Sequence, residues 1–393
     1  MSQPVLDVPF GRRDIRLDVT RGIAVLLVVV FHTARIYQEP GLMNTLWTAL
    51  TNSVWCGVDL FFVLSGFLIT GILLDSRHHE KYFINFYARR SLRIFPLFYG
   101  VLIGIFLVLP LIAPQVRTMN FWQTLSERQI WLWTYLQNFL QAQGSHQLPG
   151  LGHFWTLAVE EQFYWVWPLV VYFIPSRKLL RVALLILLLT PILRIVLLSH
   201  EVTPWAIREL TFTRIDSLVW GATAAIILRS PEVLALANKW SIRLKIGSAA
   251  FLLGVMAIVG ELKYESEIMV TVGYTAVACL FACLIFEMAQ RPVPAREPTL
   301  LEKSLAWFGT ISYGLYVFHV PISLGVLAGL KKYTTLDGIP RGIAAFFLTL
   351  VLSCIVAFIS WKLWEEPWLR LKKRFSYGSR KQVPVSGTAA AEG

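Results

Sequence analysis

The chain has 393 residues, of which 56% are hydrophobic and only 15% are charged, and its mean hydropathy is +0.59. Soluble domains carry charges on roughly 25% of their residues, so the composition excludes a soluble protein. It predicts an all-α bundle, a polytopic integral membrane protein, which we expect in the inner (plasma) membrane. A net charge of +12 is compatible with nucleic-acid binding, but the loop charges described next account for it, and we expect no nucleic-acid partner.

Ten apolar stretches are long enough to cross the hydrocarbon core of a bilayer as helices. They cover residues 19–37, 53–74, 92–113, 153–174, 179–198, 211–229, 244–261, 268–288, 305–329 and 342–363. With both termini in the cytoplasm, 26 of the 36 lysines and arginines fall on the cytoplasmic side, as the positive-inside rule requires. We therefore expect one transmembrane domain over residues 1–375 and a disordered cytoplasmic tail over 376–393.

Two shorter features complete this outline. The longest outer segment, 114–152, contains the Trp-rich stretch 130–136, which is too short to span and is expected to be interfacial or re-entrant. The four cysteines fall in apolar segments and no pair has zinc-ligand spacing with histidine, so no metal site is expected.

The first span carries an arginine at its entrance and a histidine deep inside it. Arg21 and His32 are close to three helical turns apart, so they share a face and lie roughly 16 Å apart along the axis. Ionisable groups at such depth face a cavity or a partner rather than lipid. His32 is therefore the first candidate for chemistry.

The cytoplasmic start of the third span has a cluster of arginines. Arg90 and Arg93 lie on one helix face, and a helix N-terminus with guanidinium groups suits a phosphate. The open alternative is that these arginines only anchor the span by the positive-inside rule.

Further polar residues begin the outer halves of the fourth and sixth spans. His153 and Glu160 share a face, although an acid at this helix start could simply be solvated there. Arg214 and Asp216 point to different faces, so each needs another partner, such as Glu160 or Asp59.

The ninth span places Tyr316 and His319 on one face, with Tyr313 a turn earlier. A histidine at such a position is as compatible with a structural hydrogen bond as with catalysis.

The side assignments then predict two poles. An arginine-rich cytoplasmic pole suits a phosphorylated donor, and an outer pole with Asp59, His153, Glu160, Arg214 and Asp216 suits a polyhydroxylated acceptor such as a sugar. His32 lies between the two poles.

In this order, these motifs resemble the acyltransferase-3 family of integral membrane O-acyltransferases. The matching motifs are Arg21-x10-His32, GVDLFFVLSGF at 57–67, Arg90-x-x-Arg93 with Ile94-x-Pro96, WTLxxExxFY at 155–164, Arg214-Ile215-Asp216, SYxxYxxH at 312–319 and Glu366-Pro367. The resemblance covers nearly the whole chain. It implies a stand-alone form without the esterase-like domain that some relatives carry.

The resemblance implies transfer of an acyl group, often acetyl, from cytoplasmic acyl-CoA to a hydroxyl of a carbohydrate or lipid-linked sugar at the outer side, with membrane lipid around the protein. His32 would be a general base or a transient acyl carrier, and Glu160 would orient either His32 or the acceptor. Three arginines, Arg21, Arg90 and Arg93, would bind the co-substrate acyl-CoA. The acceptor would be bound by Asp59, His153, Arg214, Asp216, Tyr313, Tyr316 and His319.

Two other functions are alternatives. A proton-coupled transporter or flippase of a sugar-linked lipid could use the same histidines and acids as a proton relay. A non-catalytic membrane sensor would not need so many deep ionisable residues.

Overall fold

The computed structural model describes residues 14–34, 41–144 and 147–375, and every regular element in these ranges is helical. The predicted tail and the end of the first predicted span lie outside the described residues. The α-helices are α1 (Ile15–Thr33), α2 (Leu42–Ser53), α3 (Gly57–Ser76), α4 (Tyr82–Ile103), α5 (Leu109–Ile112), α6 (Asn120–Trp133), α7 (Gln137–Gln141), α8 (Trp155–Phe173), α9 (Ser176–Ser199), α10 (Pro204–Glu209), α11 (Thr211–Ile227), α12 (Pro231–Val259), α13 (Tyr274–Gln290), α14 (Leu300–Thr310), α15 (Ser312–Tyr333), α16 (Gly338–Ser360) and α17 (Glu366–Arg370).

Short polar side chains cap several of these helices. Asp14 accepts a hydrogen bond from the Arg16 amide at 3.0 Å and begins α1. Thr299 and Glu302 bond to each other's backbone amides at the start of α14, which satisfies two otherwise unpaired N–H groups.

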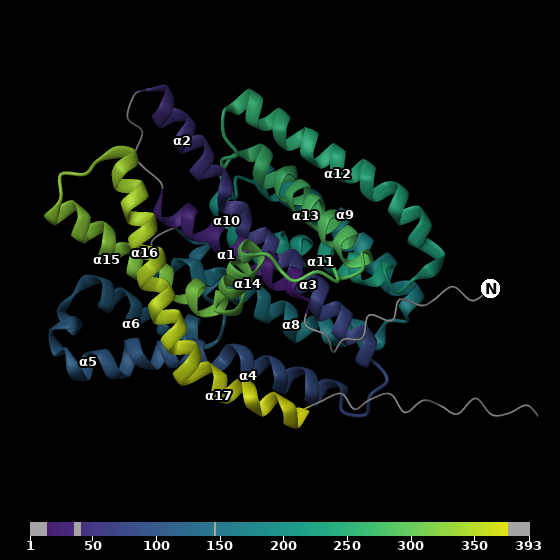
Figure 1. The fold of residues 1–393 in the computed structure, drawn as a ribbon, viewed down its shortest axis with the longest axis horizontal. Helices are drawn as coiled ribbons and strands as arrows, with labels where there is room; N and C mark the ends of the chain where they lie inside the picture. Colours follow the sequence, from purple (N-terminus) through teal and green to yellow (C-terminus); the bar gives the residue numbers. More distant parts are fainter. Residues whose placement is uncertain (1–13, 35–40, 145–146, 376–393) are drawn as a thin grey trace, which may run out of the picture.

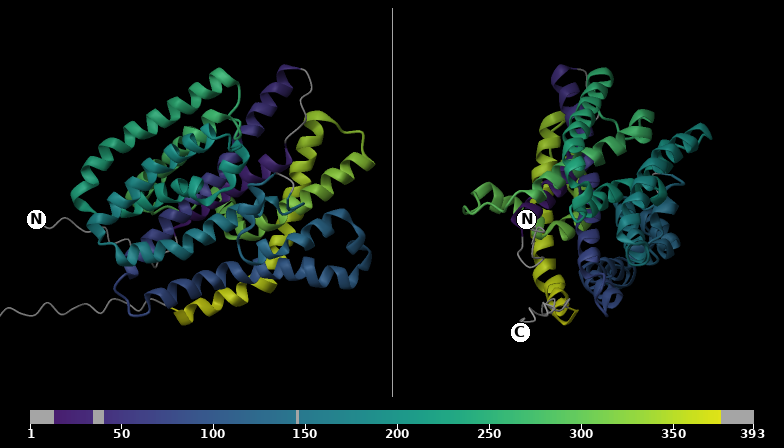
Figure 2. Two further views of the ribbon diagram at one scale, coloured as in Figure 1. Left: turned by 180° about the vertical axis from the view of Figure 1, so that it is seen from behind. Right: turned by 90° about the vertical axis from the view of Figure 1, so that its right-hand side faces the viewer.

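The helices that hold the polar residues lie in the middle of the bundle (Figure 1). There α3 and α11 pack side by side, α9, α12 and α13 cover one side, and α4 and α17 lie along the other. The turned views in Figure 2 keep the same arrangement. Burial decreases from the middle of the bundle outward. The central helix α11 buries 12 of its 17 residues, and the outer helix α12 buries only two of 29.

Two pairs of glycines allow central helices to touch through their backbones. A Cβ on Gly66 of α3 would lie 1.8 Å from the Leu218 carbonyl oxygen, and one on Gly221 of α11 would lie 1.8 Å from that of Val63. The same reciprocal contact joins Gly22 of α1 and Gly309 of α14. Small residues permit such approach where lipid offers no hydrophobic driving force.

Seven of the ten predicted spans coincide with helices that are long and apolar enough to cross a membrane. Over the described residues these are Leu42–Ser76, Tyr82–Ile112, Ser176–Ser199, Pro231–Val259, Met269–Gln290, Ser312–Tyr333 and Gly338–Phe375. The other three predicted spans fall on α1, α8 and α11, which are shorter or more polar. Because a helix surrounded by protein can carry polar groups that lipid would not accept, ten spans remain the prediction.

The described parts of the predicted outer segment, 114–144 and 147–152, fold onto the bundle. The Trp-rich stretch, 130–136, belongs mostly to α6, which ends at Trp133, and it includes Tyr135, a residue with φ of 55°. The following α7 buries Gln137 and Gln141, which donate to the carbonyl oxygens of Phe154 and Gly152. This segment thereby fixes the start of α8.

Candidate active site

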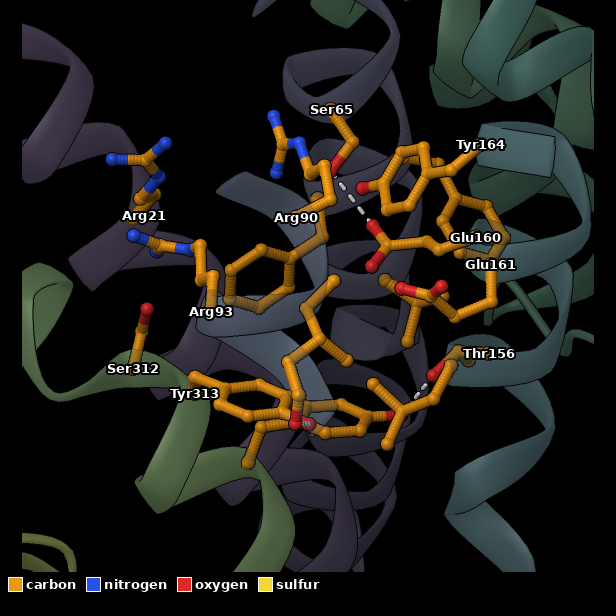
Figure 3. Close-up of a pocket in the computed structure, with 16 residues that line it drawn as sticks. Arg21, Ser65, Arg90, Arg93, Thr156, Glu160, Glu161, Tyr164, Ser312 and Tyr313 are labelled. Carbon is orange, nitrogen blue, oxygen red and sulfur yellow. Dashed lines mark hydrogen bonds between the residues drawn. The ribbon is translucent and has the colours of Figure 1, made fainter. Parts of the chain in front are cut away.

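A first cavity lies between α1, α3, α4, α8 and α15, and we call it the arginine cavity. Arg21 on α1 and Arg90 and Arg93 on α4 line one side of it, and Glu160 and Glu161 on α8 line the other (Figure 3). Ser65, Tyr164, Ser312 and Tyr313 complete its polar lining. Three guanidinium groups from two helices therefore face one space.

Two arginines of the arginine cavity have no polar partner among the described residues. Arg21 pairs with Asp18 at 3.2 Å, and Glu160 accepts a hydrogen bond from Ser65 at 2.7 Å. The Arg90 guanidinium lies over the Tyr164 ring, 5.0 Å from its centroid. Within the described ranges, neither Arg90 nor Arg93 has an ion pair or donates a hydrogen bond, so their N–H groups can serve an anionic ligand.

A second, larger cavity of about 330 Å³ lies beside the first, and we call it the histidine cavity. His32 and His153 line it together with Arg208, Glu209 and Arg214. Its remaining wall is rich in aromatic side chains, which include Trp55, Trp155, Trp205, Tyr264 and Tyr274. Flat apolar faces with a few polar groups suit the two sides of a sugar ring.

Three histidine rings meet at the histidine cavity. The ring centroid of His319 lies 4.9 Å from that of His32 and 5.0 Å from that of His153. The Nε2 atom of His319 is 3.3 Å from Nδ1 of His32. His319 therefore lies against His32, whereas His32 and His153 themselves line the cavity.

Backbone carbonyls indicate where these rings carry their protons, because a carbonyl oxygen can only accept. Nδ1 of His319 is 2.6 Å from the Tyr316 carbonyl oxygen and Nδ1 of His32 is 2.9 Å from that of Val28. Both Nδ1 atoms are therefore donors. In neutral His32 the lone pair is then on Nε2, the nitrogen that a general base would use.

Two buried ion pairs brace the helices around this cavity. Arg214 on α11 donates to Asp59 on α3 at 2.7 Å, and Ser217 donates to the same carboxylate oxygen. Arg194 on α9 pairs with Asp216 at 2.9 Å. Arg214 and Asp216 thus have separate partners, as expected, and Asp59 is the partner of Arg214.

The two cavities share part of their walls. Val58 and Tyr316 line both of them. The Tyr316 hydroxyl donates to the His153 carbonyl oxygen at 2.8 Å and lies 2.6 Å from the Thr156 hydroxyl. Tyr316 therefore stands at the boundary between the arginine cavity and the histidine cavity.

A model of the acyltransferase-3 family, described as an acyltransferase domain, matches residues 14–358. The chain belongs to this family. The match includes every element that lines the two cavities, so both lie within the family domain.

Several curated relatives carry the name O-acetyltransferase. The chain is 29% identical over 370 residues to a protein of Bacillus subtilis named putative peptidoglycan O-acetyltransferase YrhL, a match that covers 89% of this chain and 54% of that protein. It is 27% identical over 389 residues to the O-acetyltransferase OatA of Staphylococcus aureus, covering 95% of this chain and 60% of OatA. It is 27% identical over 318 residues to the peptidoglycan O-acetyltransferase OatA of Listeria monocytogenes, covering 78% of this chain and 49% of that protein.

The chain therefore spans about half to three fifths of the length of these relatives. No solved structure shows significant similarity to it.

The structure separates the residues that the family motifs predicted for the site. Arg21, Arg90, Arg93 and Tyr313 line the arginine cavity, and His32, His153 and Arg214 line the histidine cavity. Arg21 and His32 lie on the same continuous helix, so α1 contributes one residue of the predicted pair to each cavity.

Three other predicted site residues do not line the histidine cavity. Glu160 lines the arginine cavity and bonds to Ser65. His319 is fully buried against His32. The carboxylate of Asp216 bonds to Arg194 and Thr275.

Sequence reasoning also missed polar residues of both cavities. Glu161 lines the arginine cavity beside Glu160, and Arg208 and Glu209 line the histidine cavity. Arg208 and Glu209 end α10, between α9 and α11, and form an ion pair at 2.8 Å. The sequence signal that could have identified Arg208 and Glu209 is that they are adjacent, oppositely charged and close after Trp205.

Proposed function

We propose that this chain transfers an acyl group, acetyl by preference, from cytoplasmic acyl-CoA to a hydroxyl of a carbohydrate acceptor at the outer side of the membrane. The observation that carries the proposal is the shared wall between an arginine-lined cavity and a histidine-lined cavity. A transferase needs donor and acceptor sites that meet at one point, and Val58 and Tyr316 mark that point.

The arginine cavity suits the donor. Acyl-CoA carries several phosphate charges, and Arg90 and Arg93 have guanidinium N–H groups without polar partners among the described residues. Charge-assisted, bidentate contacts of this kind bind phosphate strongly. Arg21 adds a third positive charge on the same side. The positive-inside distribution of lysine and arginine supports a cytoplasmic location for this cavity.

His32 suits the transfer step. The acceptor hydroxyl gives its proton to Nε2 of His32 while its oxygen attacks the thioester carbonyl carbon. The carbon–sulfur bond breaks, CoA leaves as a thiolate, and the imidazolium returns the proton to it. The Val28 carbonyl oxygen accepts from Nδ1 of His32 and so keeps the lone pair on Nε2, while the His319 ring lies against the same Nδ1. A transient acyl-imidazole on the same nitrogen would be the two-step version of this reaction.

The acceptor side is supported by the lining of the histidine cavity and by the relatives. Aromatic faces and scattered hydrogen-bonding groups suit a saccharide, and the names of two relatives contain peptidoglycan. We therefore propose a glycan or lipid-linked sugar as acceptor, with the protein in the plasma membrane.

The test uses inverted membrane vesicles that contain the full chain and receive acetyl-labelled acetyl-CoA. We expect label in membrane glycans or lipids with the unchanged chain, and a loss of at least about 10²-fold with His32→Ala, the lower end of the rate gain that a general base supplies. His200→Ala is the matched control, because His200 is exposed at the end of α9 and bonds only locally.

Equal labelling with His32→Ala would remove His32 from the mechanism. Absence of label with the unchanged chain, together with uptake of a sugar-linked lipid that follows a pH gradient, would replace the proposal with the transporter.

A further inference from the structure

One charge pair in the wall of the histidine cavity has no role in the reaction described above. Arg208 and Glu209 end the short helix α10, which Thr203 caps through the Ala206 amide. Nη1 of Arg208 donates to Oε1 of Glu209 at 2.8 Å, and their side chains are 13% and 0% exposed. Both residues line the cavity that His32 lines.

This pair has hydrogen-bonding capacity that the protein does not use. Oε2 of Glu209 is buried and has no hydrogen-bond partner among the described residues. Arg208 donates only from Nη1 in these ranges, so its other N–H groups have no acceptor. A buried carboxylate oxygen without a partner costs free energy, which a ligand in the cavity would recover.

Aromatic rings hold Arg208 at the cavity wall. Its guanidinium carbon lies 5.0 Å from the Trp155 ring centroid, 5.3 Å from that of Trp205 and 4.7 Å from that of Tyr264. Cation–π contacts from three rings restrict the guanidinium to one orientation. The same rings line the cavity, so a ligand that reaches Arg208 also meets apolar faces.

The charges favour a neutral ligand over an anion. Arg208 is already neutralised by Glu209, and Arg214 in the same wall by Asp59. A carboxylate that approached Arg208 would also approach the Glu209 carboxyl. Two adjacent hydroxyl groups fit better, because one can donate to Glu209 while the oxygen of the other accepts from Arg208.

We infer that Arg208 and Glu209 form a two-point binding site for neighbouring hydroxyl groups of a saccharide ring and so select which acceptor hydroxyl faces His32. The inference rests on the proposed acyl transfer and adds the residues that orient the acceptor. Arg208 and Glu209 act as positioning residues, and His32 remains the group that takes the proton of the reacting hydroxyl. A site built to bond a hydroxyl discriminates strongly against a ring that presents it differently.

The test uses full-length protein in the inverted vesicles, with Glu209→Gln and Arg208→Lys. Glu209→Gln replaces an acceptor with an amide, and Arg208→Lys keeps the charge but loses the planar donor fork. Labelled glycan is digested and the acetylated ring position is read by NMR. Release of CoA from acetyl-CoA is measured in parallel in membranes depleted of acceptor.

We expect each variant to lower glycan labelling by about tenfold or more, the loss of one hydrogen bond to a charged group. We also expect acetyl groups to spread to a second ring position, and labelling to fall much more than CoA release. Glu209→Asp is expected to recover the original position in part. Glu267→Gln is the control, because Glu267 is exposed at the start of the helical stretch that includes α13. This variant should leave acetylation at one ring position.

A single unchanged ring position in both variants would overturn the inference, as would equal falls in labelling and CoA release, which indicate a structural role. Failure of the unchanged chain to label any glycan would instead remove the proposed function and this inference with it.

Discussion

At the scale of single residues, the contact between His32 and His319 joins α1 and α15 through two imidazole rings. The Tyr316 carbonyl sets the protonated nitrogen of His319, and His319 in turn faces Nδ1 of His32 at 3.3 Å. A ring that a second residue contacts in this way keeps its orientation and tautomer during a reaction. Residues that hydrogen-bond to metal-binding histidines have the same effect.

This contact predicts the effect of His319→Ala. Loss of the positioning ring should lower acetyl transfer by about 10- to 100-fold, by analogy with such supporting groups, and should shift the pH–rate profile, because His32 then has no second imidazole beside its Nδ1. His319→Gln keeps a polar group at the site and should recover part of the rate. Transfer assays of both variants from pH 5.5 to 8.5 measure this, and an unchanged profile in His319→Ala would contradict a positioning role.

The arginine cavity predicts the effect of Arg93→Ala on ligand-dependent stability. Acetyl-CoA at about 100 times its dissociation constant should stabilise the unchanged protein by about 2.7 kcal/mol. Arg93→Ala should lose most of this shift, since a phosphate contact disappears, whereas Arg177→Ala at the exposed start of α9 should keep it. Thermal unfolding in detergent with and without acetyl-CoA measures the difference; equal shifts in all three proteins would place the donor elsewhere.

At the scale of the elements, backbone contact between helices sets the positions of the site residues. The Gly66–Gly221 contact joins α3 to α11, and these helices carry Asp59 and Arg214. The Gly22–Gly309 contact fixes α1, which carries Arg21 and His32, against α14. A shift at either contact would move one side of a cavity.

Gly66→Ala should therefore destabilise the protein, because the new methyl group would overlap the Leu218 carbonyl oxygen. We expect a loss of about 1–3 kcal/mol or more, as for overpacking in a dense core. Gly254→Ala is the matched control, since no atom lies within 4 Å of its added Cβ on the outer helix α12; it should be neutral or more stable by about 1 kcal/mol. Melting temperatures in detergent compare the two, and similar values would show that the close approach is not maintained.

At the scale of the whole molecule, ten spans with both termini inside imply fixed sides for each loop. The connection before α9 should be cytoplasmic and the connection between α15 and α16 should face outward. Arg177, in the first turn of α9, lies beside the first connection, and Thr335 lies in the second; both are exposed. The arginine cavity and the histidine cavity would then open toward opposite compartments.

Cysteine labelling tests these sides. Thr335→Cys in intact cells should react with a membrane-impermeant maleimide, and Arg177→Cys should react only in inverted vesicles. The unchanged chain is the control, because its four cysteines are buried or half-buried. Reaction of both positions from one side would require a different number of spans.

The sequence by itself determined the helical membrane class and the elements that carry the polar motifs. Apolar runs predict helices, and the spacing between Arg21 and His32 places them on one face of α1. Only the tertiary structure decided that Glu160 joins the arginines, that His319 supports His32, and that Arg208 and Glu209 reach the histidine cavity. Periodicity shows which residues share a face of one helix, but which faces meet depends on packing between segments distant in the chain, here set by glycine contacts and buried ion pairs.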